Sequence, residues 1–200
     1  MRKILIIAII TLFSCGIATA QEDKLIKGFS GGMMIHGGYQ TGYDNPFGYN
    51  TQGATLGIGG VARLHIHDHF RTGIEGYVST LGLHKNIAKG SHNKLFWTGI
   101  LADWYWQSGK FYPYLGLSLG GGMETTYLMF KGSSDDWLPE DNAVFRKSGF
   151  VAIDPFVGCD VALRKAVRLT FKLDWLLAVR KHELNKPYGP RLYIGFIFAH

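Results

Sequence analysis

The sequence has few charged residues and almost no cysteine. Only 18% of its residues are charged, and its two cysteines are Cys15 and Cys159. Because Cys15 lies in an N-terminal leader, the mature chain keeps one cysteine, which excludes an internal disulfide framework. No later stretch approaches 18 consecutive apolar residues, so no membrane helix is expected after the leader. The leader holds two basic residues, so 19 of the 21 remain against 15 acidic ones. The net charge of the mature chain is therefore +4. Its basic residues do not form a basic stripe, so we expect no nucleic-acid partner.

The leader has the pattern of a secretory signal peptide. Arg2 and Lys3 give it a charged start, residues 4–13 are apolar, and "ATA" at 18–20 supplies the small residues of a cleavage site. The apolar stretch is too short to span a bilayer, which takes about 20 helical residues. We predict cleavage after Ala20 and one mature domain over residues 21–200. The alternative is lipidation of Cys15, since "LFSC" at 12–15 loosely resembles a lipoprotein box.

What the chain does contain is glycine, aromatic residues and a two-residue period. There are 27 glycines, and 14% of the residues are aromatic. In "VRLTFKLDWLLAV" (167–179) the apolar residues alternate with Arg168, Thr170, Lys172 and Asp174, which indicates a strand with one apolar and one polar face. Similar segments predict eight strands, at 25–39, 54–67, 70–84, 95–106, 111–128, 150–163, 167–179 and 190–200.

The joints between these segments alternate between short and long. Tight joints fall at 68–69, 107–110 and 164–166, whereas longer loops fall at 44–53, 85–94, 129–149 and 180–189. Turns therefore gather at one end and loops at the other, which is typical of an antiparallel up-and-down meander. The regular polar–apolar alternation predicts that this meander closes into an all-β, eight-stranded barrel.

The polar faces carry nearly balanced charge. A narrow barrel of eight strands has room inside only for side chains, and buried charges there must be paired and hydrogen-bonded. We therefore predict a polar, side-chain-filled lumen with a charge network. Its expected members are Arg63, Arg71, Glu75, Asp103, Glu124, Asp154, Asp160, Arg168, Lys172, Asp174 and Arg191.

The apolar faces carry essentially no ionisable group, which indicates that they face lipid. One Arg or Lys facing lipid at mid-bilayer costs roughly 2–4 kcal/mol. Phe70, Trp104, Trp106 and Phe111 cluster beside the tight turns, where an interfacial aromatic girdle belongs. A soluble, lipocalin-like ligand-binding barrel is the alternative. It would have an apolar interior and a densely charged exterior.

The signal peptide, the alternating joints and the closing "LYIGFIFAH" (192–200) resemble the small eight-stranded outer-membrane barrels of the OmpA barrel-domain and OmpX type. The resemblance covers residues 25–200 as architecture. It implies a location in the outer membrane of a Gram-negative bacterium, lipid and lipopolysaccharide as surroundings, and recognition of the last strand by the barrel-assembly machinery. Leu192, Ile194, Phe196 and Phe198 match the alternation of that strand, but the chain ends Ala199-His200 instead of on an aromatic residue.

Two motifs suggest chemistry, and each has an ordinary explanation. His65 and His67 in "HIHDH" would lie on one side of a strand, about 6.6 Å apart by strand rise, within reach of one zinc ion. A polar turn at the water boundary explains them equally, and we predict no metal and no cofactor. "GLSLG" (116–120) matches a serine-hydrolase pattern, but it falls within a strand and not at the strand–helix elbow that exposes the nucleophile.

Lipid A-modifying enzymes also occur among barrels of this size. Rim residues that would serve such an enzyme are Ser79, His84, Ser91, His92 and His182. Their spacing matches no such motif, so we predict a non-enzymatic, monomeric barrel whose outer loops mediate surface interaction or envelope support, with a lipid A deacylase or acyltransferase as the alternative. The longest loop is the expected docking place for a partner. Loop cations expected to contact lipopolysaccharide phosphates are Lys85, Lys89, Lys94, Arg180, Lys181 and Lys186.

Overall fold

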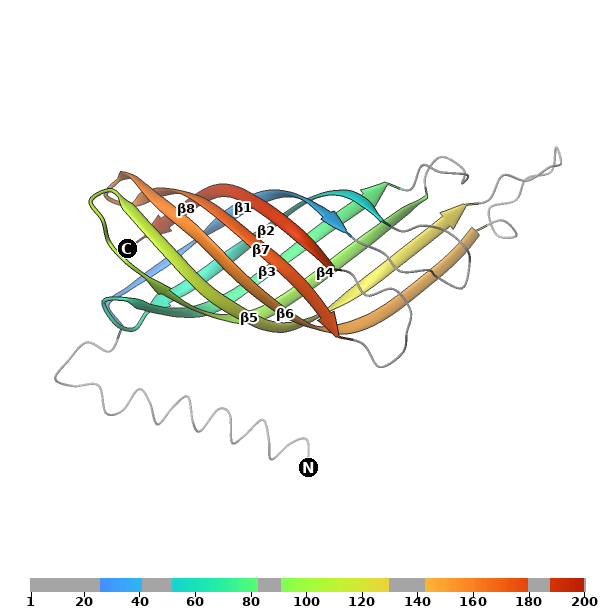
Figure 1. Cartoon of the computed structure of the whole chain (residues 1–200), viewed down its shortest axis with the longest axis horizontal. Helices are drawn as coiled ribbons and strands as arrows, with labels where there is room; N and C mark the ends of the chain where they lie inside the picture. The colour runs from blue at the N-terminus through green and yellow to red at the C-terminus, as the bar shows by residue number, and fades with distance from the viewer. Residues whose placement is uncertain (1–25, 41–51, 83–90, 130–142, 180–187, 200) are drawn as a thin grey trace, which may run out of the picture.

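Eight antiparallel strands form a closed barrel in the computed structural model, which describes residues 26–40, 52–82, 91–129, 143–179 and 188–199 (Figure 1). Each strand pairs with its neighbours in chain order, and β8 pairs with β1 to close the sheet. None of the described residues form a helix that is long and apolar enough to cross a bilayer. The strands are β1 (Gly28–Gln40), β2 (Gly53–His65), β3 (Phe70–Gly82), β4 (His92–Tyr105), β5 (Phe111–Met129), β6 (Ala143–Arg164), β7 (Val167–Val179) and β8 (Tyr188–Ala199).

The two ends of the barrel differ. The tight turns β2–β3, β4–β5 and β6–β7 lie together at one end, with the end of β8 (Figure 1). The strand ends that flank residues 41–51, 83–90, 130–142 and 180–187 lie at the other end. We call these the turn end and the loop end. The prediction of an eight-stranded up-and-down barrel is confirmed.

The strand bounds correct two predicted loops. Residues 143–149 were expected in a loop, but β6 begins at Ala143 and pairs with β5 as far as Met129↔Ala143. Arg146, Lys147 and Ser148 interrupt the apolar alternation there, yet the backbone ladder continues past them because pairing does not depend on the side chains being apolar. Residues 92–94 also belong to a strand, since β4 begins at His92. The β5–β6 hairpin consequently extends further at the loop end than the other strands (Figure 1).

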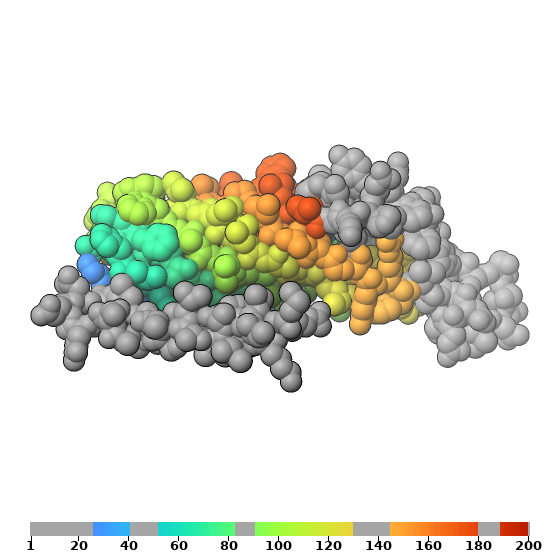
Figure 2. Space-filling model, turned by 90° about the horizontal axis from the view of Figure 1, so that it is seen from below, coloured from blue at the N-terminus to red at the C-terminus, as the bar shows by residue number. Residues whose placement is uncertain are grey.

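Side chains alternate between the lumen and the outside along each strand. In β7, Thr170 and Lys172 are fully buried, whereas Phe171 and Leu173 are exposed on the outer wall. The same holds in β8, where Leu192, Ile194, Phe196 and Phe198 are exposed and Tyr193 and Ile197 are buried. Figure 2 shows the outer side chains of neighbouring strands lying side by side along the wall. The outer surface of the strands is therefore apolar and the lumen is polar.

Glycine is required at two kinds of position. Gly109 adopts φ +61° in the β4–β5 turn, a left-handed conformation that side chains disfavour. Gly120 faces the lumen in β5, where a Cβ atom would lie 2.0 Å from the carbonyl oxygen of Thr98 on β4. Part of the high glycine content thus follows from close approach between neighbouring strands.

Candidate functional site

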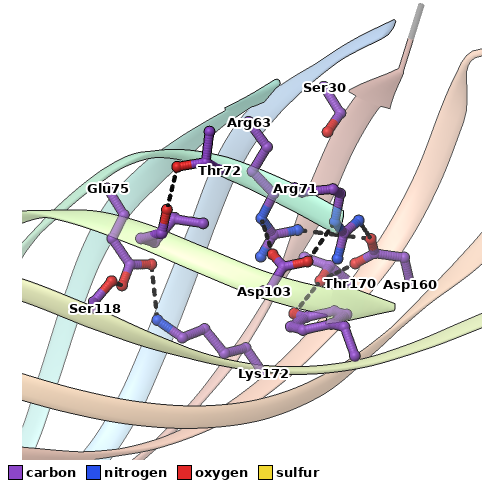
Figure 3. A network of polar contacts seen from close by, with 12 residues as sticks. Ser30, Arg63, Arg71, Thr72, Glu75, Asp103, Ser118, Asp160, Thr170 and Lys172 are labelled. Atoms are coloured by element: carbon purple, nitrogen blue, oxygen red, sulfur yellow. Dashed lines mark hydrogen bonds and ion pairs between the residues drawn. The ribbon is translucent and has the colours of Figure 1, made fainter. Parts of the chain in front are cut away.

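The lumen holds a turn-side cluster of buried ions, formed by Arg63, Arg71, Asp103 and Asp160 (Figure 3). Arg71 donates through Nε to Asp103 Oδ1 at 2.6 Å and through Nη1 to Asp160 Oδ2 at 2.9 Å. Arg63 lies 3.3 Å from Asp103 Oδ2 and 3.6 Å from Asp160 Oδ2. Thr170 adds a 2.6 Å hydrogen bond to Asp160. Two cations and two carboxylates from β2, β3, β4 and β6 therefore balance in the turn-end half of the lumen.

A second, loop-side cluster consists of Glu75, Asp154, Lys172, Asp174 and Arg191. Lys172 donates to Glu75 Oε2 at 2.8 Å and lies 3.6 Å from Asp154 and 3.5 Å from Asp174. Arg191 holds Asp174 with two hydrogen bonds of 2.8 and 3.0 Å and reaches Asp154 at 3.1 Å. Bidentate pairing of this kind is the strong form of an arginine–carboxylate contact. Two cations face three carboxylates, a formal charge of −1.

The other two predicted lumenal charges lie apart from these clusters. Glu124 is buried on β5 and accepts a 2.7 Å hydrogen bond from Asn93 Nδ2. Arg168 is half-buried near the turn end, with its guanidinium 4.1 Å from the ring centre of Tyr112. The structure thus brings nine of the eleven predicted residues into the two clusters. Glu124 lies in the lumen apart from them, and Arg168 lies where the lumen opens at the turn end.

Sequence reasoning missed the aromatic part of the lumen. Trp97, Tyr114, Phe150, Phe156 and Tyr193 are all buried there. Several rings lie over the cations of the clusters: Arg63 is 4.7 Å from Tyr114 and Lys172 is 4.5 Å from Phe156. Such contacts strengthen when they are desolvated. A signal existed, because Phe156 is two residues from Asp154 and a strand places both on the same face.

Side chains fill the lumen. Tyr77, Trp97, Lys172 and Tyr193 are each 1% exposed or less. A cavity of about 10 Å³ lies towards the loop end, lined in part by Gln40, Thr55, Ser79 and Arg191, and has room for about one water molecule. A charged, filled interior under an apolar wall is the inverse of a lipocalin-type barrel, whose binding cavity is apolar.

The histidine motif is split between two environments. His65 is buried and its Nε2 lies 2.9 Å from Ser30 Oγ, whereas His67 lies exposed in the β2–β3 turn. The expectation that both share a strand face is therefore wrong, because β2 ends at His65. Within the described part of the chain, no group of three or more His, Cys, Asp or Glu side chains could hold a metal ion.

An exposed ion pair joins the same turn to Lys27, the residue before β1. Lys27 Nζ donates a 2.7 Å hydrogen bond to Asp68 Oδ1. This bond and the ammonium charge hold the pKa of Asp68 below its usual value. The pair neutralises the side of the turn end formed by β1, β2 and β3.

The described enzyme candidates are not brought together as a catalytic group. Ser79 bonds to His36 Nε2 inside the barrel at 2.6 Å, and Ser91 accepts from the backbone N–H of Met129 at 2.9 Å. His92 lies against the ring of Tyr127. Ser118 of the "GLSLG" motif is fully buried and donates to Glu75 Oε1, in the middle of a strand as expected. His84 and His182 lie outside the described residues.

One of the six predicted lipopolysaccharide-contacting cations falls within the described chain. Lys94 is exposed on the outer wall of β4, near the loop end. It pairs across to Thr125 on β5, which in turn pairs with Lys147 on β6, so the two lysines flank one threonine on the same face. The other five, which lie outside the described residues, are Lys85, Lys89, Arg180, Lys181 and Lys186.

Comparison with known proteins agrees with this architecture. No protein-family model and no curated protein sequence matches the chain. Among solved structures it is similar to Neisserial surface protein A, with 14% identity, a TM-score of 0.58, and coverage of 86% of this chain and 96% of that one.

Two further structures have TM-scores of 0.51. They are Ail, the attachment invasion locus protein of Yersinia pestis, in complex with the heparin analogue sucrose octasulfate, and OprG from Pseudomonas aeruginosa. Ail is 12% identical, and the match covers 88% of this chain and 100% of the Ail chain. OprG is 13% identical, and the match covers 86% of this chain and 95% of the OprG chain. The chain therefore has the fold of the small eight-stranded outer-membrane β-barrels.

Proposed function

We propose that the protein is an integral outer-membrane barrel without enzymatic activity, and that its barrel is a closed anchor for loops that mediate surface interaction or envelope support. The observation that carries this proposal is the filled lumen. Among the residues that the structure describes, two ion clusters and buried aromatic rings fill the lumen, and a cavity near the loop end has room for about one water molecule. A passage for solutes or a pocket for a substrate would need far more space than this.

The outer wall supports a location within a bilayer. Residues such as Ile74, Ile100 and Leu117 are 61%, 66% and 43% exposed, which is unusual for large apolar side chains over so much of a surface. Polar groups on this wall are satisfied locally: Thr98 donates to the carbonyl oxygen of Glu75 and Thr72 to that of Leu101. In a closed barrel every strand is also paired on both sides, as lipid requires. The protein is exported by a cleaved signal peptide and inserted as a monomer by the barrel-assembly machinery, with β8 as the recognised strand.

Lipopolysaccharide is the partner that fits the loop end. Lys94 and Lys147 flank Thr125 on one face of three neighbouring strands, about 10 Å apart from strand spacing. Two cations at that separation on the outer wall can approach phosphate groups of a lipid A headgroup while their stems stay against apolar neighbours. Lys147 already lies 5.1 Å from the ring centre of Phe145.

The proposal is tested by separating the barrel from its loops. Residues 41–51, 83–90, 130–142 and 180–187 are replaced by short Gly- and Ser-containing turns, and both forms are expressed in a Gram-negative host. We expect both to fractionate with the outer membrane and to migrate differently on a denaturing gel when unboiled. We expect only the full chain to increase cell binding to heparin-coated wells or to protect cells against detergent. Ail, by name an attachment protein seen with a heparin analogue, motivates that probe.

Two outcomes would contradict the proposal. Equal binding and equal detergent resistance in the two forms would show that the loops do not carry the function. A change in the mass spectrum of lipid A that depends on the chain would replace it with the enzyme alternative. For the lipopolysaccharide contact, Lys94→Gln with Lys147→Gln should reduce lipopolysaccharide co-purification, while Lys165→Gln at the turn end should not.

A further inference from the structure

The turn end carries a basic patch on one side of the barrel, formed by Lys110, Arg164, Lys165 and Arg168. The first three are exposed and Arg168 is half-buried. The backbone N–H of Ala162 donates to the carbonyl oxygen of Lys110 at 2.8 Å, which fixes the β4–β5 turn beside the end of β6. Arg164 and Lys165 follow two and three residues later, at a β-bulge, so the patch covers the adjoining ends of β5, β6 and β7.

This patch has no acidic counterpart among the residues that the structure describes. Asp68 is the described acid of the turns, and it lies in the β2–β3 turn, bonded to Lys27. Asp103 and Asp160 are fully enclosed in the lumen and engaged by Arg63 and Arg71. The four cations of the patch therefore keep a formal charge of +4, while the β2–β3 side of the same end has a balanced ion pair.

The patch adjoins the apolar wall. Trp106, Phe111 and Leu163 are 43%, 55% and 54% exposed and belong to the same turns and strand ends. Aromatic residues in this position lie at the headgroup level of a bilayer, and lysine and arginine beside them extend their charges towards the interface. The surface thus combines several cations with an apolar floor, which fits a molecule that has an anionic head and hydrocarbon chains.

We propose that the basic patch binds the headgroup phosphate of an anionic phospholipid in the leaflet at the turn end. The inference rests on the proposed insertion in a membrane. It adds that the barrel prefers anionic phospholipid at the turn end, beside the ends of β5, β6 and β7. Lys110, Arg164 and Lys165 surround the phosphate, and the acyl chains lie along Phe111 and Leu163. A soluble acidic polymer would use the charges but would leave the adjoining apolar residues without a role.

The test uses the mature barrel in phosphatidylcholine vesicles that contain phosphatidylglycerol brominated on its acyl chains. Quenching of tryptophan fluorescence by the brominated phosphatidylglycerol is compared with quenching by brominated phosphatidylcholine, and the ratio measures the lipid preference around the tryptophans. The difference between the wild type and Trp106→Phe gives the part of the signal that comes from Trp106. We expect a preference for phosphatidylglycerol that weakens with added salt. In the triple variant Lys110→Gln, Arg164→Gln, Lys165→Gln, this preference should fall roughly tenfold or more, since one basic residue near an anionic surface contributes about fivefold.

A control variant, Lys27→Gln with Asp68→Asn, removes the ion pair on the other side of the same end and should keep the wild-type preference. An equal loss in both variants, or no loss in the patch variant, would overturn the proposal. So would capture of soluble polyglutamate by the barrel in neutral vesicles without any lipid preference, which would assign the patch to an acidic polymer. Failure of the wild type to insert, seen as identical gel mobility with and without boiling, would reject the proposed function as well and is distinguishable from these outcomes.

Discussion

Replacing Lys172 by Met removes the cation that three buried carboxylates share. The distances from Lys172 Nζ are 2.8 Å to Glu75, 3.5 Å to Asp174 and 3.6 Å to Asp154, and all four side chains are fully enclosed. Methionine is unbranched like lysine and close to it in volume, so packing changes little. The formal charge of the loop-side cluster then goes from −1 to −2. Removing one partner of a buried pair costs about 3–5 kcal/mol, because the other charge stays desolvated.

The assay is urea unfolding of the barrel in vesicles, followed by tryptophan fluorescence and by the gel mobility of unboiled samples. With a slope of about 2 kcal/mol per M, the expected loss lowers the unfolding midpoint by about 1.5–2.5 M. Leu173→Met on the adjoining outer face is the control and should shift it far less, since a volume-conserving swap costs under about 1.5 kcal/mol.

The double variant Lys172→Met, Glu75→Gln returns the formal charge to −1. We expect it to recover part of the loss, with a coupling of about 0.5–3 kcal/mol between the two sites. If Lys172→Met unfolds at the same urea concentration as Leu173→Met, the cluster does not stabilise the barrel. Strict additivity in the double variant would likewise refute the idea that charge balance decides the effect.

Three further predictions concern other parts of the barrel. Gly120→Ala should destabilise it by about 1–3 kcal/mol in the same unfolding assay, because the new Cβ would meet backbone 2.0 Å away, while Gly76→Ala, whose nearest neighbour is 3.4 Å away, should be tolerated. Leu117→Arg on the outer wall should cost roughly 2–4 kcal/mol in vesicles, and a cost near zero would contradict a lipid-facing wall. Lys27→Ala should let the pKa of Asp68 rise towards its ordinary value, which NMR titration of the Asp68 carboxyl measures; an unchanged pKa would show that the ion pair is absent in solution.

The sequence was sufficient for the strand count and for the orientation of the faces. In β7 the polar residues Arg168, Thr170, Lys172 and Asp174 stand at every second position, and only a strand sorts them from the apolar side chains. The closed barrel confirms that interpretation. Strand ends were less predictable. β6 continues through Arg146 and Lys147, which interrupt the apolar alternation because their charged side chains are exposed or half-exposed. The backbone pairing with β5 nevertheless continues past them.

The partners within the lumen could not be read from alternation. The two-residue period predicts that Glu75 and Lys172 both point inwards. Their 2.8 Å contact joins β3 to β7 across the barrel, and it depends on the tilt of the strands and on their pairing register. Aromatic residues were missed for a different reason. The predicted lumenal network was built from charged residues alone, so Trp97 and Tyr193 were not assigned to it, although their parity with Asp103 and Arg191 places them inside.

The pairing of β8 with β1 has a consequence for how the molecule must assemble. Arg191 on β8 meets its partner Asp174 on the neighbouring strand β7, so this ion pair does not depend on closure. A sheet still open between β8 and β1 would present two rows of bare peptide groups to hydrocarbon. Intermediates whose sheet is still open are therefore strongly disfavoured inside the bilayer. Insertion and barrel closure should be concerted, and they should begin only when all eight strands are available.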